Sequence, residues 1–175
     1  MNKLIRVENR ETLSLENDGL NVHRGWDEKL ARQFAQLAHR QMPIARSPRS
    51  LEASVEALNL WDSDKRPEVY SLGRQATLLA VAHFLLNPSP ETKAPYEFVA
   101  NLGSPQIDDD QARSFFAASH YDFSQHSRYE GPIYAQVQEG DPLRKIYEAN
   151  GYRVKQRESD TLLLVRKGMQ KKGVA

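Results

Sequence analysis

Apolar residues recur along the chain with two different periods, and the change of period separates predicted helices from predicted strands. Over residues 26–38 they recur every three or four positions, which predicts an amphipathic helix that ends at Pro43. Ser47 followed by Pro48 opens a second predicted helix, because serine caps a helix and proline suits its first position. Residues 77–86 are almost continuously apolar and β-branched, which favours a central strand covered on both faces; a helix is the competing interpretation.

Shorter segments complete the predicted sheet. Seven of them are predicted strands: residues 4–7, 12–15, 69–72, 96–102, 132–137, 152–157 and 161–166. The turn-forming residues 17–19 follow the second of these, and residues 158–160 join the last two into a β-hairpin.

Two more helices are marked by their termini. Asp108 and Gln111 have the spacing of a capping box, which opens a helix that carries residues 112–119. Asp141-Pro142 opens a shorter helix, and Gly151 follows it where a left-handed C-cap is expected. These elements predict a single α/β (α+β) domain over residues 1–168, followed by a flexible C-terminal tail at residues 169–175.

The segment Lys145-Ile146-Tyr147-Glu148-Ala149-Asn150-Gly151-Tyr152 ends a predicted helix and leads into a strand. It resembles the segment of the GNAT N-acyltransferase superfamily in which a helix ends Tyr-x-x-x-Gly-Phe/Tyr before a C-terminal strand. The similarity is most specific over residues 132–166, plausible over residues 77–119 and weak before them. It implies a GNAT-like domain, with a mixed, mostly antiparallel twisted sheet and helices on both faces.

The resemblance also implies an acyl-transfer site. In the family, the strand matching residues 96–102 splays away from the strand matching residues 132–137, and an acyl-pantetheine arm lies in the gap. The tyrosine matching Tyr147 protonates the leaving thiolate, which a phenol with a pKa of about 10 can do while staying neutral beforehand. Glu97 matches the family's catalytic base, and His83 is the second choice. The backbone positions implied to hold the cofactor are Val99, Ala100, Asn101, Leu102, Gly103 and Ser104.

Each of these residues also has a structural interpretation. Apart from the resemblance, Tyr147 fits a half-buried core tyrosine, Glu97 a solvent-facing strand residue and His83 a core histidine. The pattern alone leaves both interpretations open.

The expected phosphate-binding loop departs from the family pattern. Members that bind coenzyme A carry a Gln/Arg-x-x-Gly-x-Gly/Ala loop, whose N–H groups hold the pyrophosphate at a helix N-terminus. Residues 101–110 contain one glycine and no basic residue, and they end in three aspartates that suit a helix N-terminus but repel a polyanion. The resemblance still implies acetyl-CoA or another acyl thioester as donor, but one that is held differently, for example on a carrier protein. It is also open that the helix alignment is shifted and that another loop binds the phosphates. The alternative is a catalytically degenerate binding or structural module, regulatory or phage-type, that acts through protein–protein contacts.

Composition narrows the classes of function. The chain of 175 residues has a formal net charge of +1, so no strong field draws it to nucleic acid or to an anionic membrane. It has no cysteine, which excludes disulfides, thiolate nucleophiles and cysteine-ligated metals, and we expect no metal site. The early charges give no signal peptide, and no apolar run approaches the roughly 20 residues of a membrane span. We expect a cytoplasmic protein without membrane attachment.

The expected partner is an amine-bearing acceptor or another protein. Nucleic acid stays open because basic residues gather between the first two helices: His39, Arg40, Arg46 and Arg49. Aromatic residues and histidines over residues 120–134 are predicted to surround a loop, which either packs on its own rings or binds a partner. A homo-oligomer is a further alternative.

Overall fold

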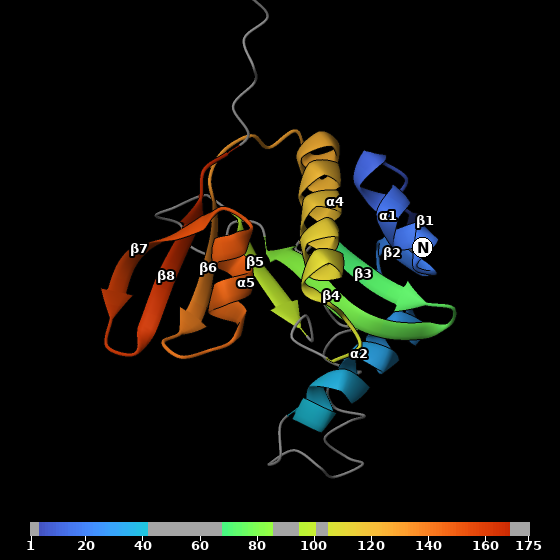
Figure 1. The fold of residues 1–175 in the computed structure, drawn as a ribbon, viewed down its shortest axis with the longest axis horizontal. Helices are drawn as coiled ribbons and strands as arrows, with labels where there is room; N and C mark the ends of the chain where they lie inside the picture. The colour runs from blue at the N-terminus through green and yellow to red at the C-terminus, as the bar shows by residue number, and fades with distance from the viewer. Residues whose placement is uncertain (1–3, 42–67, 86–94, 101–104, 169–175) are drawn as a thin grey trace, which may run out of the picture.

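Eight strands form one sheet in the computed structural model, which describes residues 4–41, 68–85, 95–100 and 105–168 (Figure 1). Their order across the sheet is β1-β2-β3-β4-β5-β6-β8-β7, and every neighbouring pair is antiparallel except β5 and β6. The strands are β1 (Ile5–Arg6), β2 (Leu20–Arg24), β3 (Glu68–Arg74), β4 (Thr77–Leu85), β5 (Tyr96–Ala100), β6 (Ile133–Gln138), β7 (Tyr152–Glu158) and β8 (Thr161–Arg166). The predicted mixed, mostly antiparallel sheet is confirmed.

Helices cover both faces of this sheet, as the sequence predicted: α1 (Leu13–Asn17), α4 (Asp109–Ser127) and α5 (Leu143–Ala149) lie on one face, and α2 (Glu28–Gln41) lies on the other (Figure 1). Successive side chains of a strand point to opposite faces. Val69 of β3 therefore packs with Leu30 of α2 and with Trp26, which precedes that helix, whereas its neighbour Tyr70 enters the larger core beneath α4.

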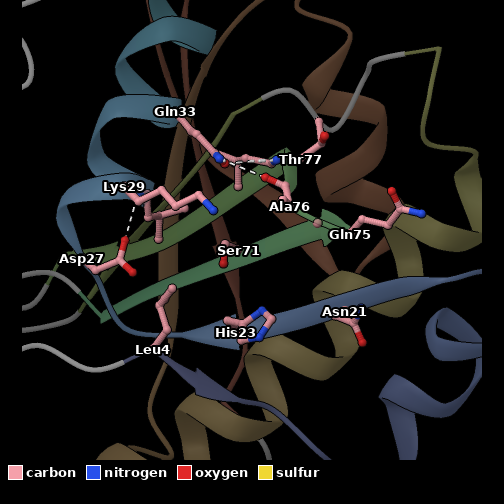
Figure 2. A pocket seen from close by; sticks show the side chains of 13 residues that line it. Leu4, Asn21, His23, Asp27, Lys29, Gln33, Ser71, Gln75, Ala76 and Thr77 are labelled. Carbon is pink, nitrogen blue, oxygen red and sulfur yellow. Dashed lines mark hydrogen bonds between the residues drawn. The ribbon is translucent and has the colours of Figure 1, made fainter.

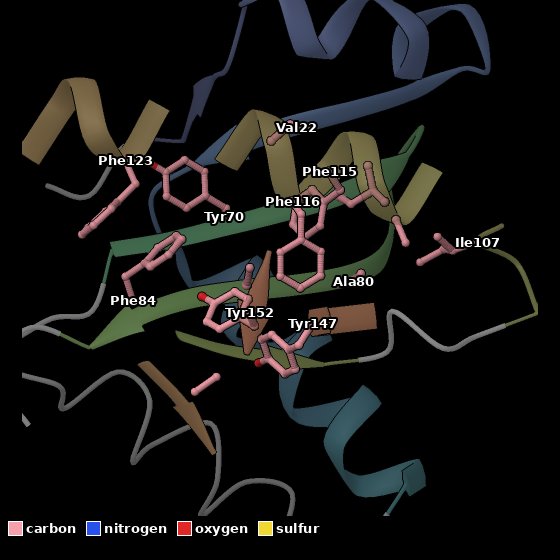
Figure 3. Close-up of a cluster of buried hydrophobic side chains, with 14 of the residues drawn as sticks. Val22, Tyr70, Ala80, Phe84, Ile107, Phe115, Phe116, Phe123, Tyr147 and Tyr152 are labelled. Atoms are coloured by element: carbon pink, nitrogen blue, oxygen red, sulfur yellow. The ribbon is translucent and has the colours of Figure 1, made fainter. Parts of the chain in front are cut away.

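Aromatic rings fill the larger core (Figure 3). Phe84 of β4 stacks on Phe123 of α4, with ring centroids 4.2 Å apart, and Tyr70 meets the edge of Phe84 at 5.7 Å. Such pairs contribute about 0.5–1.5 kcal/mol beyond the burial of their area. The C-terminal half of α4 is thereby fixed on the sheet.

The N-terminal region differs from its prediction. Residues 12–15 were expected to form a strand, but they belong to the helical turn η1 (Arg10–Thr12) and to α1. The reason is Asn9, whose side chain accepts hydrogen bonds from the N–H groups of Glu11 at 3.0 Å and Thr12 at 3.1 Å. Thr12 Oγ1 in turn accepts from the Asn9 N–H at 3.1 Å, which completes a capping box. The strand of this region is β2, which the sequence prediction omitted.

The predicted loop around residues 120–134 is also wrong for its first half. Helix α4 continues to Ser127 and ends at Arg128, which has a φ of +55°. Phe116, His120 and Phe123 are buried along one stripe of this helix, at intervals of four and three residues. Their rings pack under the helix on the sheet, so neither interpretation of the loop applies to them.

The other predicted termini are confirmed. The Asp108 carboxylate accepts from the Gln111 N–H at 2.7 Å, and the Gln111 side chain accepts from the Asp108 N–H at 3.1 Å. Asp141 accepts from the Leu143 N–H at 2.9 Å at the start of α5, and Gly151 has the expected left-handed φ of +91°. Several predicted features lie outside the described residues: the helix after Ser47, Arg46 and Arg49, and the tail at residues 169–175.

Two findings concern the described residues as a set. None of their helices is both long and apolar enough to cross a membrane. They also contain no group of three or more histidine, aspartate or glutamate side chains placed to hold a metal ion.

Candidate functional site

Strands β5 and β6 run parallel but meet only where they begin. Tyr96 is opposite Tyr134, and the Tyr134 N–H donates to the Pro95 carbonyl at 3.0 Å. Beyond this point the described parts of β5 and β6 do not pair with each other. β5 stays paired with β4 as far as Ala100, and β6 stays paired with β8 as far as Gln138. One side of β5 is therefore left without a strand partner.

Tyr147 of α5 occupies this side of β5. Its side chain is only 2% exposed, and its hydroxyl donates to the backbone carbonyl of Glu97 at 3.3 Å. The backbone N–H of Val99 bonds to the same hydroxyl. A length of 3.3 Å marks a weak hydrogen bond. The phenol thus satisfies backbone groups that a neighbouring strand would otherwise take.

The Tyr147 hydroxyl remains protonated well into the alkaline range. Burial and then the nearby Glu97 carboxylate raise the pKa of Tyr147 well above its usual value, and the N–H of Val99 acts in the opposite direction. At neutral pH the group is therefore a neutral hydrogen-bond donor.

The Glu97 side chain lies inside the protein, not on the solvent face that the alternation of β5 suggested. It is 1% exposed and points toward α4, where its Oε2 atom lies 2.6 Å from Nε2 of His120. The hydroxyl of Tyr152 donates to the same oxygen. The Oε1 atom is buried and has no hydrogen-bond partner among the described residues.

Two residues connected to Glu97 were not singled out as a site in the sequence. His120 continues the network, because its Nδ1 atom lies 2.5 Å from Nη1 of Arg166 on β8. Tyr152 is the last residue of the Tyr-x-x-x-Gly-Tyr segment, at which the family accepts Phe or Tyr. A signal for His120 was present in its helical spacing from Phe116, whereas nothing in the sequence pattern links Arg166 to it.

Aromatic rings enclose this polar network. Tyr147 meets Tyr152 edge to face at 4.9 Å and Phe116 at 5.6 Å, as Figure 3 shows. His120 contacts Phe84 at 5.2 Å and Tyr152 at 6.0 Å. Burial and then the Glu97 charge raise the pKa of Tyr152 well above its usual value. The carboxylate is therefore buried among apolar rings, where the low local dielectric strengthens the hydrogen bonds inside the cluster.

The remaining predicted site residues are only partly described. Asn101, Leu102, Gly103 and Ser104 lie outside the described residues. His83 and Ala100 are described by their backbones alone, paired with Phe98 and Val81 across the β4–β5 ladder. Their proposed roles in catalysis and cofactor binding stay predictions.

The N-terminus of α4 is occupied by acidic side chains. Asp108 takes the Gln111 N–H, and the exposed Asp109 and Asp110 follow in the first turn, the latter 3.4 Å from Arg113. A pyrophosphate at this helix end would meet three carboxylates, so the described residues do not fit it there. The unpaired side of β5, in contrast, fits the amide groups of a pantetheine arm.

A separate hollow of about 140 Å³ lies between α2 and the opposite face of the sheet (Figure 2). Two of its polar side chains help to hold the helix: Asp27 accepts from the Leu30 N–H at 2.7 Å, and Gln33 bonds to the backbone of Ala76 and Leu78. Burial, and then Arg6, lower the pKa of His23 in this hollow, against the opposing effect of Asp27. This hollow and the Tyr147 cluster therefore belong to different faces.

No protein-family model matches the sequence, and no curated protein sequence matches it. Solved structures do match the fold over most of the chain. RimL, a ribosomal L7/L12 α-N-protein acetyltransferase, has a TM-score of 0.67 at 14% identity and covers 95% of this chain and 95% of its own. Mutant forms of the spermidine/spermine N-acetyltransferase SpeG from Vibrio cholerae have a TM-score of 0.64 at 14% identity, and the match covers 86% of this chain and 95% of theirs. An acetyltransferase of the GNAT family from Streptococcus pneumoniae has a TM-score of 0.59 at 10% identity, and the match covers 83% of this chain and 96% of its own. The chain has the GNAT-superfamily fold that its sequence resembled.

Proposed function

We propose that this GNAT-fold protein is an N-acyltransferase, which moves an acyl group from a thioester donor to an amine. The observation that carries the proposal is the unpaired side of β5, with the Tyr147 hydroxyl set against the backbone of Glu97 and Val99. The fold supports it, since RimL is a ribosomal L7/L12 α-N-protein acetyltransferase and SpeG is a spermidine/spermine N-acetyltransferase. The acceptor would be an amine-bearing molecule, and the expected location is the cytoplasm.

The donor would lie along β5 as an extended chain. Backbone groups of Val99, on the same side of β5 as the Glu97 carbonyl, would pair with an amide of a pantetheine arm, as a strand added to a sheet edge does, whereas those of Ala100 face β4. Asn101, Leu102, Gly103 and Ser104 would continue this contact. The donor is acetyl-CoA or another acyl thioester, including one on a carrier protein, because the acidic end of α4 disfavours a pyrophosphate at that place.

Tyr147 and Glu97 would divide the proton transfers. As the amine nitrogen bonds to the thioester carbonyl carbon, the carbon–sulfur bond breaks and the sulfur leaves as a thiolate. Tyr147 would donate to that sulfur, which its neutral, protonated state allows. Glu97 would take the proton that the amine loses, and Oε1 is the carboxylate oxygen with free acceptor capacity. His83 remains the second assignment for this base.

A thermal-shift titration with acetyl-CoA and with S-acetyl-pantetheine tests donor binding. Ligand at a hundredfold above its dissociation constant stabilises a protein by about 2.7 kcal/mol, which for a chain of this size raises the melting temperature by about 5–10 °C. Free-thiol release in the presence of a panel of amines then tests turnover. Absence of both signals with every donor at millimolar concentration would refute the enzyme and favour the binding-module alternative.

The Tyr147→Phe variant tests the assigned acid. We expect kcat to fall by about 100-fold, since proton transfer from a placed side chain contributes about 10²–10⁴-fold. Tyr121→Phe is the matched control, because that tyrosine is exposed on the outer face of α4. Unchanged turnover in Tyr147→Phe would remove the tyrosine from the mechanism even if the protein is a transferase.

A further inference from the structure

We infer that His120 and Arg166 are positioning residues, which hold the Oε2 atom of Glu97 and leave its Oε1 atom as the proton acceptor of the acyl transfer. This inference rests on the proposed function. Its basis is which group donates and which group accepts in each hydrogen bond of the buried network.

Arg166 fixes the state of the histidine. A guanidinium carries only donors, so its Nη1 group, 2.5 Å from Nδ1 of His120, has to donate to that nitrogen. Nδ1 therefore holds a lone pair, and the single ring proton of the neutral imidazole is on Nε2. Arg166 thus selects one tautomer of His120.

That tautomer in turn fixes how the Oε2 atom of Glu97 is bonded. The Nε2–H of His120 donates to Oε2 at 2.6 Å, and the Tyr152 hydroxyl, which burial keeps protonated, donates to the same oxygen. An oxygen that accepts two hydrogen bonds carries no proton of its own. The neutral imidazole therefore links Oε2 to the cationic Arg166.

The two oxygens of Glu97 are left with different roles. Oε2 is saturated, whereas Oε1 is buried and makes no hydrogen bond with the described residues. Leaving a buried acceptor unsatisfied costs about 1–3 kcal/mol, and more for a charged group, so such an atom in a folded core calls for an explanation. The backbone carbonyl of the same residue accepts a hydrogen bond from the proposed acid, Tyr147.

The titratable groups that face this carboxylate come from four elements: His120 of α4, Tyr147 of α5, Tyr152 of β7 and Arg166 of β8. Arg166 is the only permanent cation among them. Its removal should free His120 to change tautomer and should loosen the hydrogen bond that orients Glu97.

Nitrogen-15 NMR of the imidazole measures the tautomer without any need for turnover. In the unmodified protein at neutral pH we expect His120 as the Nε2–H tautomer, and in Arg166→Met a mixture that includes the Nδ1–H form. A wild-type spectrum with Nδ1–H or with both nitrogens protonated would overturn the inference. This test uses the wild-type protein alone, so it holds even if the Arg166→Met variant does not fold.

Kinetics test the positioning role. We expect Arg166→Met to lower kcat by about tenfold to 100-fold, because a misplaced base loses part of its contribution to the rate, with the donor KM unchanged. Arg166→Lys keeps a cationic donor, and His120→Gln keeps one acceptor and one donor, so both should stay within about threefold of wild type. Arg153→Met, on an exposed position of β7, is the matched control.

The outcomes separate this inference from the proposed function. If no thioester and amine give turnover, the proposed function fails, and the assignment of Oε1 as acceptor fails with it, whatever the tautomer. If turnover occurs and the tautomer is as expected, but Arg166→Met matches the control, the network is structural and the positioning role is overturned.

Discussion

Alkaline pH should destabilise this protein through three buried tyrosines. Tyr70, Tyr147 and Tyr152 are all buried, and the pKa of each is raised, first by burial and then by a carboxylate, which is Asp122 for Tyr70 and Glu97 for the other two. In the unfolded chain each phenol ionises at a pKa of about 10. The folded state keeps protons that the unfolded state releases, so this stability is complete below about pH 10 and is lost as pH rises toward the folded-state pKa values.

The size of the effect follows from proton linkage. One proton held by the folded state and released by the unfolded state changes the free energy of unfolding by about 1.4 kcal/mol per pH unit. Three such tyrosines together give about 4 kcal/mol per unit above about pH 10. A domain with the usual total stability of about 5–15 kcal/mol should therefore unfold within a few units above that pH.

Chemical denaturation at a series of pH values from about 9 to about 11, which span the usual tyrosine pKa, measures how the free energy of unfolding changes with pH. Tyrosinate absorbance under native conditions should show that part of the seven tyrosines ionises only on unfolding. Tyr152→Phe should reduce the slope by about a third, because it removes one of the three groups, whereas Tyr121→Phe, at a position 42% exposed, should leave it unchanged. Equal slopes in these two variants, or no loss of stability above about pH 10, would refute the reasoning.

Three further predictions concern stability and are measured by chemical denaturation. Asp108→Ala removes the cap of α4 and should cost about 1 kcal/mol, whereas Asp108→Asn keeps an acceptor and should cost little. Asp122→Ala should cost about 2 kcal/mol, because Arg24 loses a charged partner at 2.6 Å; a loss no larger than that of Asp110→Ala, at the exposed start of α4, would contradict it. Gly151→Ala should cost about 1–2 kcal/mol from its φ of +91° alone, since an added Cβ would meet nothing closer than 3.6 Å.

Segments with two agreeing signals were predictable from sequence. The start of α4 combines the Asp108–Gln111 cap with helical periodicity, and the C-terminal hairpin combines alternation with turn residues. Residues 12–15 gave a misleading signal, because Thr-Leu-Ser-Leu alternates as a strand does. The decisive hydrogen bonds come from Asn9, which precedes that pattern. A short stretch of alternating apolar and polar residues therefore does not distinguish a strand from a helix when a helix-capping residue precedes it.

The network around Glu97 could not be predicted, for a different reason. Glutamate between apolar strand residues normally faces solvent, because a buried charge requires compensation. The compensation here comes from His120, Tyr152 and Arg166, which are 23, 55 and 69 positions away in sequence. Only the fold brings them together. Tyr147 was identified because its local segment is specific, whereas its contact with β5 depends on how far β5 and β6 diverge.

Tyr147 also acts as an internal competitor for β5. Its hydroxyl holds the backbone carbonyl of Glu97, and it is tethered to the chain, so its effective concentration exceeds that of any free ligand. A donor that pairs with the same backbone has to displace it, and the apparent affinity falls by the fraction of molecules in which the phenol has moved away. The weak contact of 3.3 Å keeps that penalty small. If β5 binds the donor as proposed, the residue assigned to the leaving sulfur would also compete for the strand, and shortening its side chain should tighten donor binding while slowing the chemistry.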